Sequence, residues 1–363
     1  MGKICYKFSH NMDIHDHAEL KGLSLNQLMD FTTDTNPLGP SNKAKNAVRK
    51  KVRHLCRPPD GRSRHLKRLL CAAEKISEEK IIIGPDPAYT ISVLLKITCP
   101  KTALIPSPVS DAYKKLLKEQ NVEIKPFHLN SEKGFAFDMG RFIREMKDAD
   151  CILMPNPHDM VGTCLPPDAL RPIIAQASAM NKLLVIDEAK NDFAAVSSPV
   201  QEIAGSSRSV ILRTFSDFHA LSGFRFGYAI GSGELTQSVR NYLGHFPVDP
   251  LAEAAAVASL RDKGYRKRTL AYIKEEKRFI LNSFAGSDRV QCIDTPCSFL
   301  LLKLGEKIAG LRDSFLQRRI IVVDFTDKKG SQYIRLPVGK HAWNARLIRA
   351  LKNISGVTKP CSE

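Results

Sequence analysis

Polar side chains follow three apolar, strand-like runs of this sequence. They are Asn156 and Asp159 after "CILMP", Asp187 after "LLVI", and Ser216 and Asp217 after "VILRTF". In an open parallel sheet, ligands bind beyond the carboxyl ends of the strands, so these side chains are the first candidates for a functional site. Carboxylate, amide and hydroxyl groups gathered at one place can move protons, orient a substrate or hold a charged cofactor.

Asp187 alone leaves two interpretations open. A carboxylate that follows four apolar strand residues is either a functional group or the cap of the next helix. Asp217 raises a sharper question, because it lies in a turn between an apolar run and a second strand that carries Arg225. The role of Asp217 decides whether the chain is an enzyme.

Strand-like and helix-like segments alternate along most of the chain. Short apolar runs near residues 81–84, 102–106, 151–155 and 183–187 are separated by helical patterns, which predicts a mainly parallel α/β sheet. After about residue 290 the strands look antiparallel and predict a small C-terminal α+β domain. We expect an N-terminal arm over 1–45, a large domain over 46–265 and a small domain over 266–363.

The composition is that of a globular protein with a basic surplus. The 363 residues include 55 Lys and Arg against 38 Asp and Glu, a formal net charge of +17. The densest basic runs, 43–54 and 62–68, have helical apolar spacing, so solvated helix faces explain them. No aromatic residues are interleaved with them, and we do not expect nucleic acid as a partner. A small anionic or amino-acid-like ligand is compatible with the charge.

The cysteines, histidines and apolar runs indicate where the protein is located and whether it binds a metal. Nine cysteines without a Cys-x-x-Cys pair predict reduced thiols and a cytoplasmic protein. No apolar run reaches the roughly 18 residues of a membrane helix. His10, His15 and His17 have a spacing that matches no standard metal site, so we expect no metal.

Five segments spread over nearly the whole chain form a more specific pattern. They are "LMDFTTDTNPLGPS" (28–41), "NPHDMVG" (156–162), "VIDEAKNDF" (185–193), "LRTFSDFHALSGFRFGY" (212–228) and "YIRLPVGKHAWNARLIRAL" (333–351). The first four resemble "DFSxNxNPLGP", "NPNNPTG", "VDEAYxxF" and "LRSLTKFYALPGLRLGY" of fold-type I pyridoxal-phosphate enzymes, namely histidinol-phosphate aminotransferase and threonine-phosphate decarboxylase. The fifth resembles the closing segment of these families. The resemblance implies an aminotransferase-like fold.

Several residues keep the place that this resemblance assigns to a functional group. Asp187 matches the aspartate that pairs with the pyridinium nitrogen, and Ser216 and Arg225 match phosphate-binding residues. Arg335 matches the arginine that holds the substrate carboxylate, and Asn156 keeps its place in the motif. The resemblance therefore implies pyridoxal phosphate as the ancestral cofactor.

Other matching positions carry a different side chain. Asp217 stands where the resemblance places the Schiff-base lysine, Asp159 where it places the asparagine at the ring hydroxyl, and Lys190 where it places a tyrosine. Asp86 lies in the region of the phosphate-binding cup, and Ser110 where a stacking aromatic ring is expected. Two further substitutions, Cys56 for a tyrosine that reaches the neighbouring subunit and Val323 for an arginine, extend the pattern.

These departures favour a protein that has lost normal pyridoxal-phosphate catalysis and acts in binding or regulation, as a homodimer. The alternative is an active aminotransferase or decarboxylase of amino-acid or cobalamin side-chain metabolism that acts on a phosphorylated amino acid, with Lys190 as a substitute nucleophile. In the first case we expect an internal ion network. Asp86, Asp217 or both would pair with Arg225, which would form a positive cluster with Arg213. Lys190 would neutralise the charge of Asp187.

Overall fold

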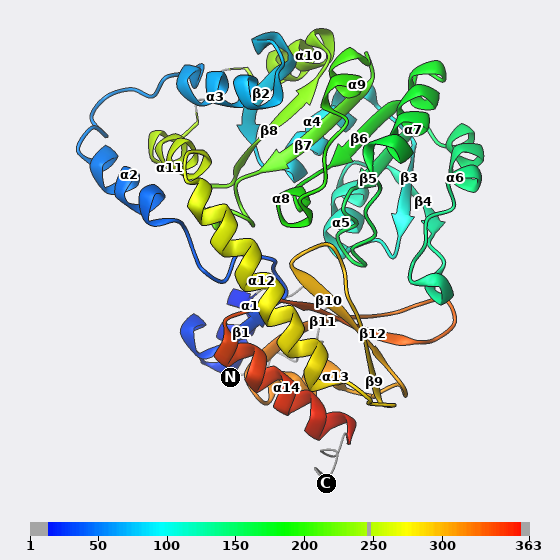
Figure 1. The fold of residues 1–363 in the computed structure, drawn as a ribbon. Helices are drawn as coiled ribbons and strands as arrows, with labels where there is room; N and C mark the ends of the chain where they lie inside the picture. The colour runs from blue at the N-terminus through cyan, green and yellow to red at the C-terminus, as the bar shows by residue number, and fades with distance from the viewer. Residues whose placement is uncertain (1–13, 245–247, 357–363) are drawn as a thin grey trace, which may run out of the picture. The chain divides into compact units, whose positions relative to one another are not determined.

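The structure is a computed structural model that describes residues 14–244 and 248–356 (Figure 1). Its chain divides into two compact units. The larger unit comprises residues 35–274 and 295–298, and the smaller unit comprises the chain up to Asp34, residues 275–294 and the chain from Phe299 onward. No helix within the described ranges is long and apolar enough to cross a membrane.

A seven-stranded sheet forms the centre of the larger unit, in the order β2-β8-β7-β6-β5-β3-β4. Strands β7, β6, β5, β3 and β4 are parallel, and β8 is antiparallel to both of its neighbours. The predicted mainly parallel α/β sheet is confirmed. The strands are β2 Ile81–Pro85, β3 Thr102–Ser107, β4 Glu123–His128, β5 Cys151–Pro155, β6 Leu183–Asp187, β7 Ser209–Thr214 and β8 Phe226–Gly231.

Helices cover both faces of this sheet because its central strands are apolar on both sides. Val185, Val210 and Leu212 belong to a core shared with α4, α5 and α10. The residues between them, such as Ile186 and Ile211, point to the opposite face, since side chains alternate along a strand. The helices are α2 Asn42–Val52, α3 Arg64–Glu74, α4 Pro87–Thr98, α5 Asp111–Glu119, α6 Met139–Glu145, α7 Pro167–Ala179, α8 Asn191–Ala194, α9 Val200–Gly205, α10 Gly233–Leu243, α11 Pro250–Leu260 and α12 Lys263–Ser283.

The smaller unit contains a five-stranded sheet in the order β1-β11-β12-β10-β9. Its strands pair antiparallel, except that β1 is parallel to β11. The predicted α+β character of the C-terminal part is confirmed. The elements are α1 Ile14–Lys21, β1 Met29–Phe31, β9 Val290–Ile293, β10 Phe299–Leu304, α13 Leu311–Leu316, β11 Ile320–Thr326, β12 Gln332–Pro337 and α14 His341–Ser355.

Strand pairing gives unit limits that differ from the boundaries expected from the sequence. Met29 lies opposite Ile320 in the β1–β11 pair, and residues 14–34 fall in the same compact unit as the C-terminal elements, whereas the sequence suggests an arm over 1–45. The expected boundary between 265 and 266 falls inside α12, which continues from the larger unit into the smaller one. A three-residue strand paired across almost 300 residues leaves little signal in local periodicity.

Candidate functional site

Three parallel strands of the larger unit end side by side. Pro155 of β5 lies opposite Asp187 of β6, and Asp187 lies opposite Leu212 of β7. The polar segments that follow these strands therefore meet at one edge of the sheet, as the sequence predicted.

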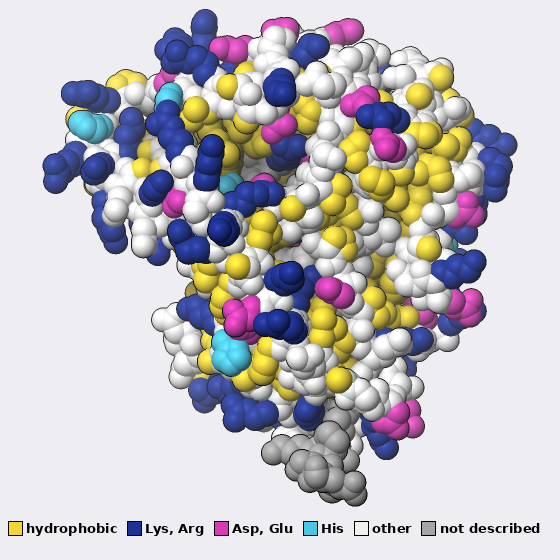
Figure 2. Space-filling model, viewed as in Figure 1, with side chains coloured by type: hydrophobic (Ala, Val, Ile, Leu, Met, Phe, Trp, Pro, Cys, Tyr) yellow, Lys and Arg dark blue, Asp and Glu magenta, His cyan; other side chains and the backbone are white. Residues whose placement is uncertain are grey.

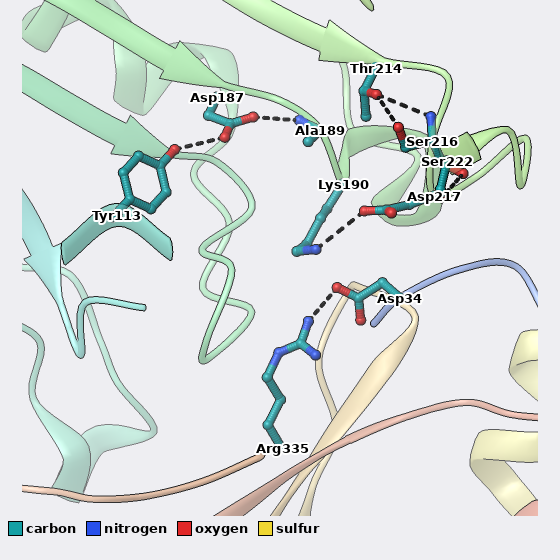
Figure 3. A network of polar contacts seen from close by, with 10 residues as sticks. All are labelled: Asp34, Tyr113, Asp187, Ala189, Lys190, Thr214, Ser216, Asp217, Ser222 and Arg335. Atoms are coloured by element: carbon teal, nitrogen blue, oxygen red, sulfur yellow. Dashed lines mark hydrogen bonds and ion pairs between the residues drawn. The ribbon is translucent and has the colours of Figure 1, made fainter. Parts of the chain in front are cut away.

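Asp187 is already hydrogen-bonded within the chain (Figure 3). Its carboxylate accepts the Tyr113 hydroxyl of α5 at 2.7 Å and the Ala189 N–H at 2.9 Å. Burial raises the pKa of Asp187, whereas the two hydrogen bonds and the nearby Lys190 charge act in the opposite direction. Burial also raises the pKa of Tyr113 well above its ordinary value, so the phenol remains a donor. The Tyr113 hydroxyl is thus the side-chain hydrogen-bond donor to the Asp187 carboxylate.

Lys190 and Asp217 form an ion pair. Lys190 lies in the turn after β6, Asp217 lies in the turn after β7, and Lys190 Nζ is 3.5 Å from Asp217 Oδ2 (Figure 3). Both side chains are largely buried, with exposed fractions of 14% and 21%. The charge of Lys190 acts to lower the pKa of Asp187, and the Lys190 ammonium group donates to Asp217.

Asp86 combines two roles at the start of α4. Its carboxylate caps the helix by accepting the Tyr89 N–H at 3.1 Å, and it forms an ion pair with Arg225 at 2.6 Å. The predicted pairing of Asp86 with Arg225 is therefore confirmed. Helix N-termini bind anions because their free N–H groups and dipole attract negative charge. In this protein the anion at the N-terminus of α4 belongs to the chain itself.

The expected cluster of Arg213 with Arg225 is not formed. Arg213 donates from Nε to Glu188 at 2.9 Å and from one terminal nitrogen, Nη1, to Glu74 of α3. Burial acts to lower the pKa of the Arg213 guanidinium, but Tyr228, Glu188 and Glu74 together hold this pKa well above its ordinary value. Arg213 precedes Thr214 on β7, so the alternation of side chains along the strand places the two on opposite faces of the sheet.

Ser216 and Ser110 both take part in local backbone structure. Ser216 accepts the Thr214 hydroxyl at 2.9 Å, and its N–H donates to the same hydroxyl at 3.1 Å. Ser110 lies at the N-cap position of α5. The buried Ser110 hydroxyl has no hydrogen-bond partner within the described residues.

Asn156 closes its own loop. Its side chain donates to the Leu165 carbonyl at 3.0 Å and accepts the Leu165 N–H at 2.7 Å, and it is only 4% exposed. Gly162 completes this loop in the left-handed region at φ +76°, where a Cβ atom would lie 2.6 Å from Thr295 Cβ. The two hydrogen bonds of the Asn156 side chain with the Leu165 backbone therefore hold the loop that resembles "NPNNPTG".

Asp159 follows a neutral histidine. His158 Nδ1 faces the N–H groups of Met160 and Val161 at 3.2 and 3.3 Å, and Nε2 lies 3.2 Å from the Pro106 carbonyl. These partners require an acceptor at Nδ1 and a proton at Nε2, so the ring carries no charge. The contact of His158 with Asp159 at 3.6 Å is then not an ion pair. Asp159 instead adds a negative charge near Asp187 and Tyr113.

Arg335 belongs to the smaller unit and is neutralised there. It lies on β12 and forms an ion pair with Asp34 (Figure 3). Its guanidinium carbon also lies 4.0 Å from the centroid of the Phe299 ring. Val323, where the resemblance expects an arginine, lies opposite Arg335 in the β11–β12 register. The chain therefore provides a carboxylate for the arginine that resembles a substrate-carboxylate binder.

No group of three or more His, Cys, Asp or Glu side chains in 14–244 and 248–356 could hold a metal ion. His15 and His17 lie within these ranges, whereas His10 lies outside the described residues.

Residues 23–351 match the family model "Aminotransferase class I and II". The chain belongs to the class I and II aminotransferase family. Among its aminotransferase-family relatives, threonine-phosphate decarboxylase of Salmonella typhimurium is 24% identical over 96% of this chain and 97% of that protein. Histidinol-phosphate aminotransferase of Methanosphaera stadtmanae is 25% identical over 93% of each.

Solved aminotransferase structures share the fold. Histidinol-phosphate aminotransferase from Sinorhizobium meliloti, in complex with pyridoxal-5'-phosphate, aligns with a TM-score of 0.85 at 18% identity over 96% of each chain. The histidinol-phosphate aminotransferase from Clostridium acetobutylicum aligns with a TM-score of 0.81 at 24% identity over 91% of this chain and 100% of that one. The sequence-based resemblance to this aminotransferase family is confirmed.

Two residues of these networks were missed by the sequence reasoning. Asp34 stands where the motif "DFSxNxNPLGP" has its first asparagine. This substitution by a carboxylate can be seen in the sequence and could have indicated a partner for a cation. Tyr113 lies on the buried face of α5 and had no motif to distinguish it from an ordinary core residue.

Proposed function

We propose that this member of the aminotransferase family does not carry out pyridoxal-phosphate catalysis and acts as a binding or regulatory protein. The observation that carries the proposal is the Lys190–Asp217 ion pair. Asp217 occupies the position that the resemblance gives to the Schiff-base lysine, and a carboxylate cannot form that bond. Lys190 is the nearest substitute, but an ammonium group that donates to a carboxylate has no free lone pair with which to attack an aldehyde.

The anion site supports the same proposal. A cofactor phosphate at the N-terminus of α4 would meet the Asp86 carboxylate, which already caps the helix and pairs with Arg225. Two unit charges about 4 Å apart repel by roughly 4 kcal/mol at an effective dielectric constant near 20. The residues present therefore do not fit a covalently held pyridoxal phosphate.

A second candidate function is an active aminotransferase or decarboxylase that acts on a phosphorylated amino acid. The observation that favours it is the position of Lys190, close enough to Asp187 for its charge to lower the pKa of that carboxyl group. The relatives named threonine-phosphate decarboxylase and histidinol-phosphate aminotransferase indicate the substrate class to test. In this case Lys190 would have to leave Asp217 to become a nucleophile.

Borohydride trapping distinguishes the two functions. Purified protein is incubated with pyridoxal phosphate, reduced with borohydride and mapped by peptide mass spectrometry, in parallel with a Lys190→Ala variant. We expect labelling at exposed lysines only, to the same extent in both proteins, and no turnover of threonine phosphate or histidinol phosphate. An adduct at Lys190 together with turnover that is lost in Lys190→Ala would establish the second function instead.

We further propose a cytoplasmic homodimer, since dimers are typical of the family. Cys56, which takes the place of the tyrosine that reaches the neighbouring subunit, is exposed. Loss of one cross-subunit contact leaves the rest of such an interface in place, so the dimer persists without a shared cofactor site. Sedimentation that gives only monomer at micromolar concentration would contradict this proposal.

A further inference from the structure

The C-terminal part of the smaller unit carries a large share of the positive charge. Residues 299–356 contain twelve Lys and Arg against four Asp and Glu, a surplus of eight within the chain's net charge of +17. Helix α14 contains two Arg and one Lys but no acidic residue. In Figure 2, Lys and Arg side chains gather at the lower edge of the view, where Figure 1 places α14. A surface of one sign raises the local concentration of oppositely charged partners.

Three residues of this part form what we call the arginine patch: Arg318, Arg346 and Arg349. Arg346 and Arg349 lie about one turn apart on the exposed face of α14, and Arg346 Nη2 donates to the Arg318 carbonyl at 3.1 Å. Arg318 follows α13, and its Nη1 donates to the Ser314 carbonyl at 2.7 Å. These contacts bring the end of α13 to the exposed face of α14 and hold two of the three guanidinium groups in place.

The arginine patch keeps its positive charge. Within residues 14–244 and 248–356, none of its three side chains forms an ion pair. The carbonyl partners of Arg318 and Arg346 are neutral and use one N–H group of each guanidinium, whereas a guanidinium has five. All three residues are exposed, so the remaining N–H groups are open to an anion at little desolvation cost.

Helix stability does not explain these charges. Lys352 lies in the last turn of α14, where the helix dipole stabilises a cation, but Arg346 and Arg349 precede that turn. Two like charges three residues apart destabilise a helix slightly. A helix face that meets only water usually mixes both signs, which α14 does not. The charges of the patch therefore call for an external anion.

The chemistry of the patch selects among anionic partners. Ala342 and Asn353 share the exposed face of α14, so this face has no large apolar side chain to insert into a membrane and no aromatic ring to stack on bases. Exposed charges hold a single small anion weakly, so the partner must present several anionic groups together. The chain's own ends, residues 1–13 and 357–363, contain three Lys against two acids and do not complement the patch.

We propose that the arginine patch is a docking site for an acidic segment of a partner protein. Aspartate and glutamate side chains spaced along one chain contact the three guanidinium groups together, and each planar guanidinium binds a carboxylate through two parallel N–H bonds. The patch belongs to the smaller unit, whereas Cys56, which takes the place of the tyrosine that reaches the neighbouring subunit, belongs to the larger unit.

Fluorescence anisotropy with a labelled peptide of about twelve glutamates tests this site. The protein should bind this peptide at least about tenfold more tightly than the matching glutamine peptide, and added salt should weaken the binding. Arg346→Glu/Arg349→Glu should weaken it about tenfold, because two attractions become repulsions. Arg349 has no hydrogen bond or ion pair within the described part of the chain. Arg349→Glu alone should therefore leave the melting temperature unchanged and weaken binding about threefold.

A matched control separates the patch from general charge. Lys115→Glu/Lys118→Glu makes the same change in net charge at exposed positions of α5, in the larger unit, and should weaken binding by less than about twofold. Equal losses in the two double variants, or no binding of the glutamate peptide at low salt, would overturn the proposal. So would a nucleic-acid strand of about twelve nucleotides, or phosphatidylserine vesicles, that bind more tightly than the peptide and are released by Arg346→Glu/Arg349→Glu.

Discussion

Asp34 and Arg335 form an ion pair in the interior of the smaller unit, with side chains that are only 2% and 4% exposed. The Phe299 ring covers the guanidinium from one face. A buried ion pair contributes little relative to an apolar pair, but the loss of one partner leaves an uncompensated charge. Asp34 is therefore the residue that allows Arg335 to remain buried without an external anion.

Asp34→Asn should destabilise the protein and make it responsive to carboxylates. Removal of the buried partner of Arg335 should lower the free energy of unfolding by about 3 kcal/mol. A small dicarboxylate that enters to neutralise Arg335 should restore part of this loss, measured as a rise in melting temperature. Asp138→Asn, which alters an exposed helix cap, is the control and should gain nothing from the dicarboxylate. An identical response of wild type and Asp34→Asn would contradict the role assigned to Asp34.

Lys190 and Asp217 should show a coupling energy of about 1 kcal/mol in a double-mutant cycle of alanine variants. Asp217→Lys should place two cations in contact and lower the free energy of unfolding by roughly 1 kcal/mol or more. This variant should not gain transamination or decarboxylation activity, because Asp86, Asp159 and Ser110 remain unchanged. The measurements are urea denaturation and a turnover assay with pyridoxal phosphate present. Activity in Asp217→Lys alone would refute the view that several parts of the site have changed together.

Asp187→Asn should stabilise the protein at neutral pH. Since burial raises the pKa of Asp187 in the folded state, the folded protein holds this proton at pH values where the unfolded chain has lost it. Stability therefore falls as pH rises from the ordinary aspartate pKa to the raised folded value. The asparagine oxygen still accepts the Ala189 N–H, and its amide group can donate to the Tyr113 oxygen. Because the asparagine carries no charge to desolvate, the variant should gain stability at neutral pH, and this gain should vanish in acid.

Glu188→Gln should have the opposite effect on stability to Asp187→Asn. The pKa of Glu188 is also raised by burial, but its carboxylate pairs with Arg213. Its replacement should destabilise the protein at neutral pH because the buried guanidinium loses a partner. Urea denaturation across acid and neutral pH should thus give effects of opposite sign for the two variants. A loss of stability in Asp187→Asn at neutral pH would mean that its carboxylate charge is still needed.

Asp86→Ala should cost about 1 kcal/mol of stability, the usual value of a helix N-cap. Asp86→Asn keeps a good capping group and loses only the charge pair with Arg225, whose side chain is 75% exposed. Exposed pairs contribute little, so this variant should lose less than about 0.5 kcal/mol. Thermal denaturation of both variants separates the cap from the ion pair. Equal losses in the two would show that the charge of Asp86, and not the cap, stabilises this end of α4.

The sheet and the edge that carries the site could be predicted from the sequence, whereas the partner of each side chain could not. Strand ends at Pro155, Asp187 and Thr214 follow from apolar runs, and parallel pairing then brings the next residues together. The partner of a side chain depends on the direction in which that side chain points, which the sequence does not reveal. The sequence therefore suggests that Arg213 lies beside Arg225, whereas in the structure Arg213 pairs with Glu74 and Glu188. The Asp34–Arg335 pair joins positions 301 apart in sequence, a relation that no local pattern encodes.

The cap on α4 also changes how the stability of this protein depends on its surroundings. A protein that binds a cofactor only when folded gains stability in proportion to the logarithm of the free cofactor concentration, and loses it when the supply falls. The Asp86 carboxylate is tethered to the helix that it caps, so its effective concentration there is constant and high. The end of α4 is therefore stabilised to the same extent at every concentration of vitamin or metabolite. With the proposed function, this end of the fold needs no bound cofactor for its stability.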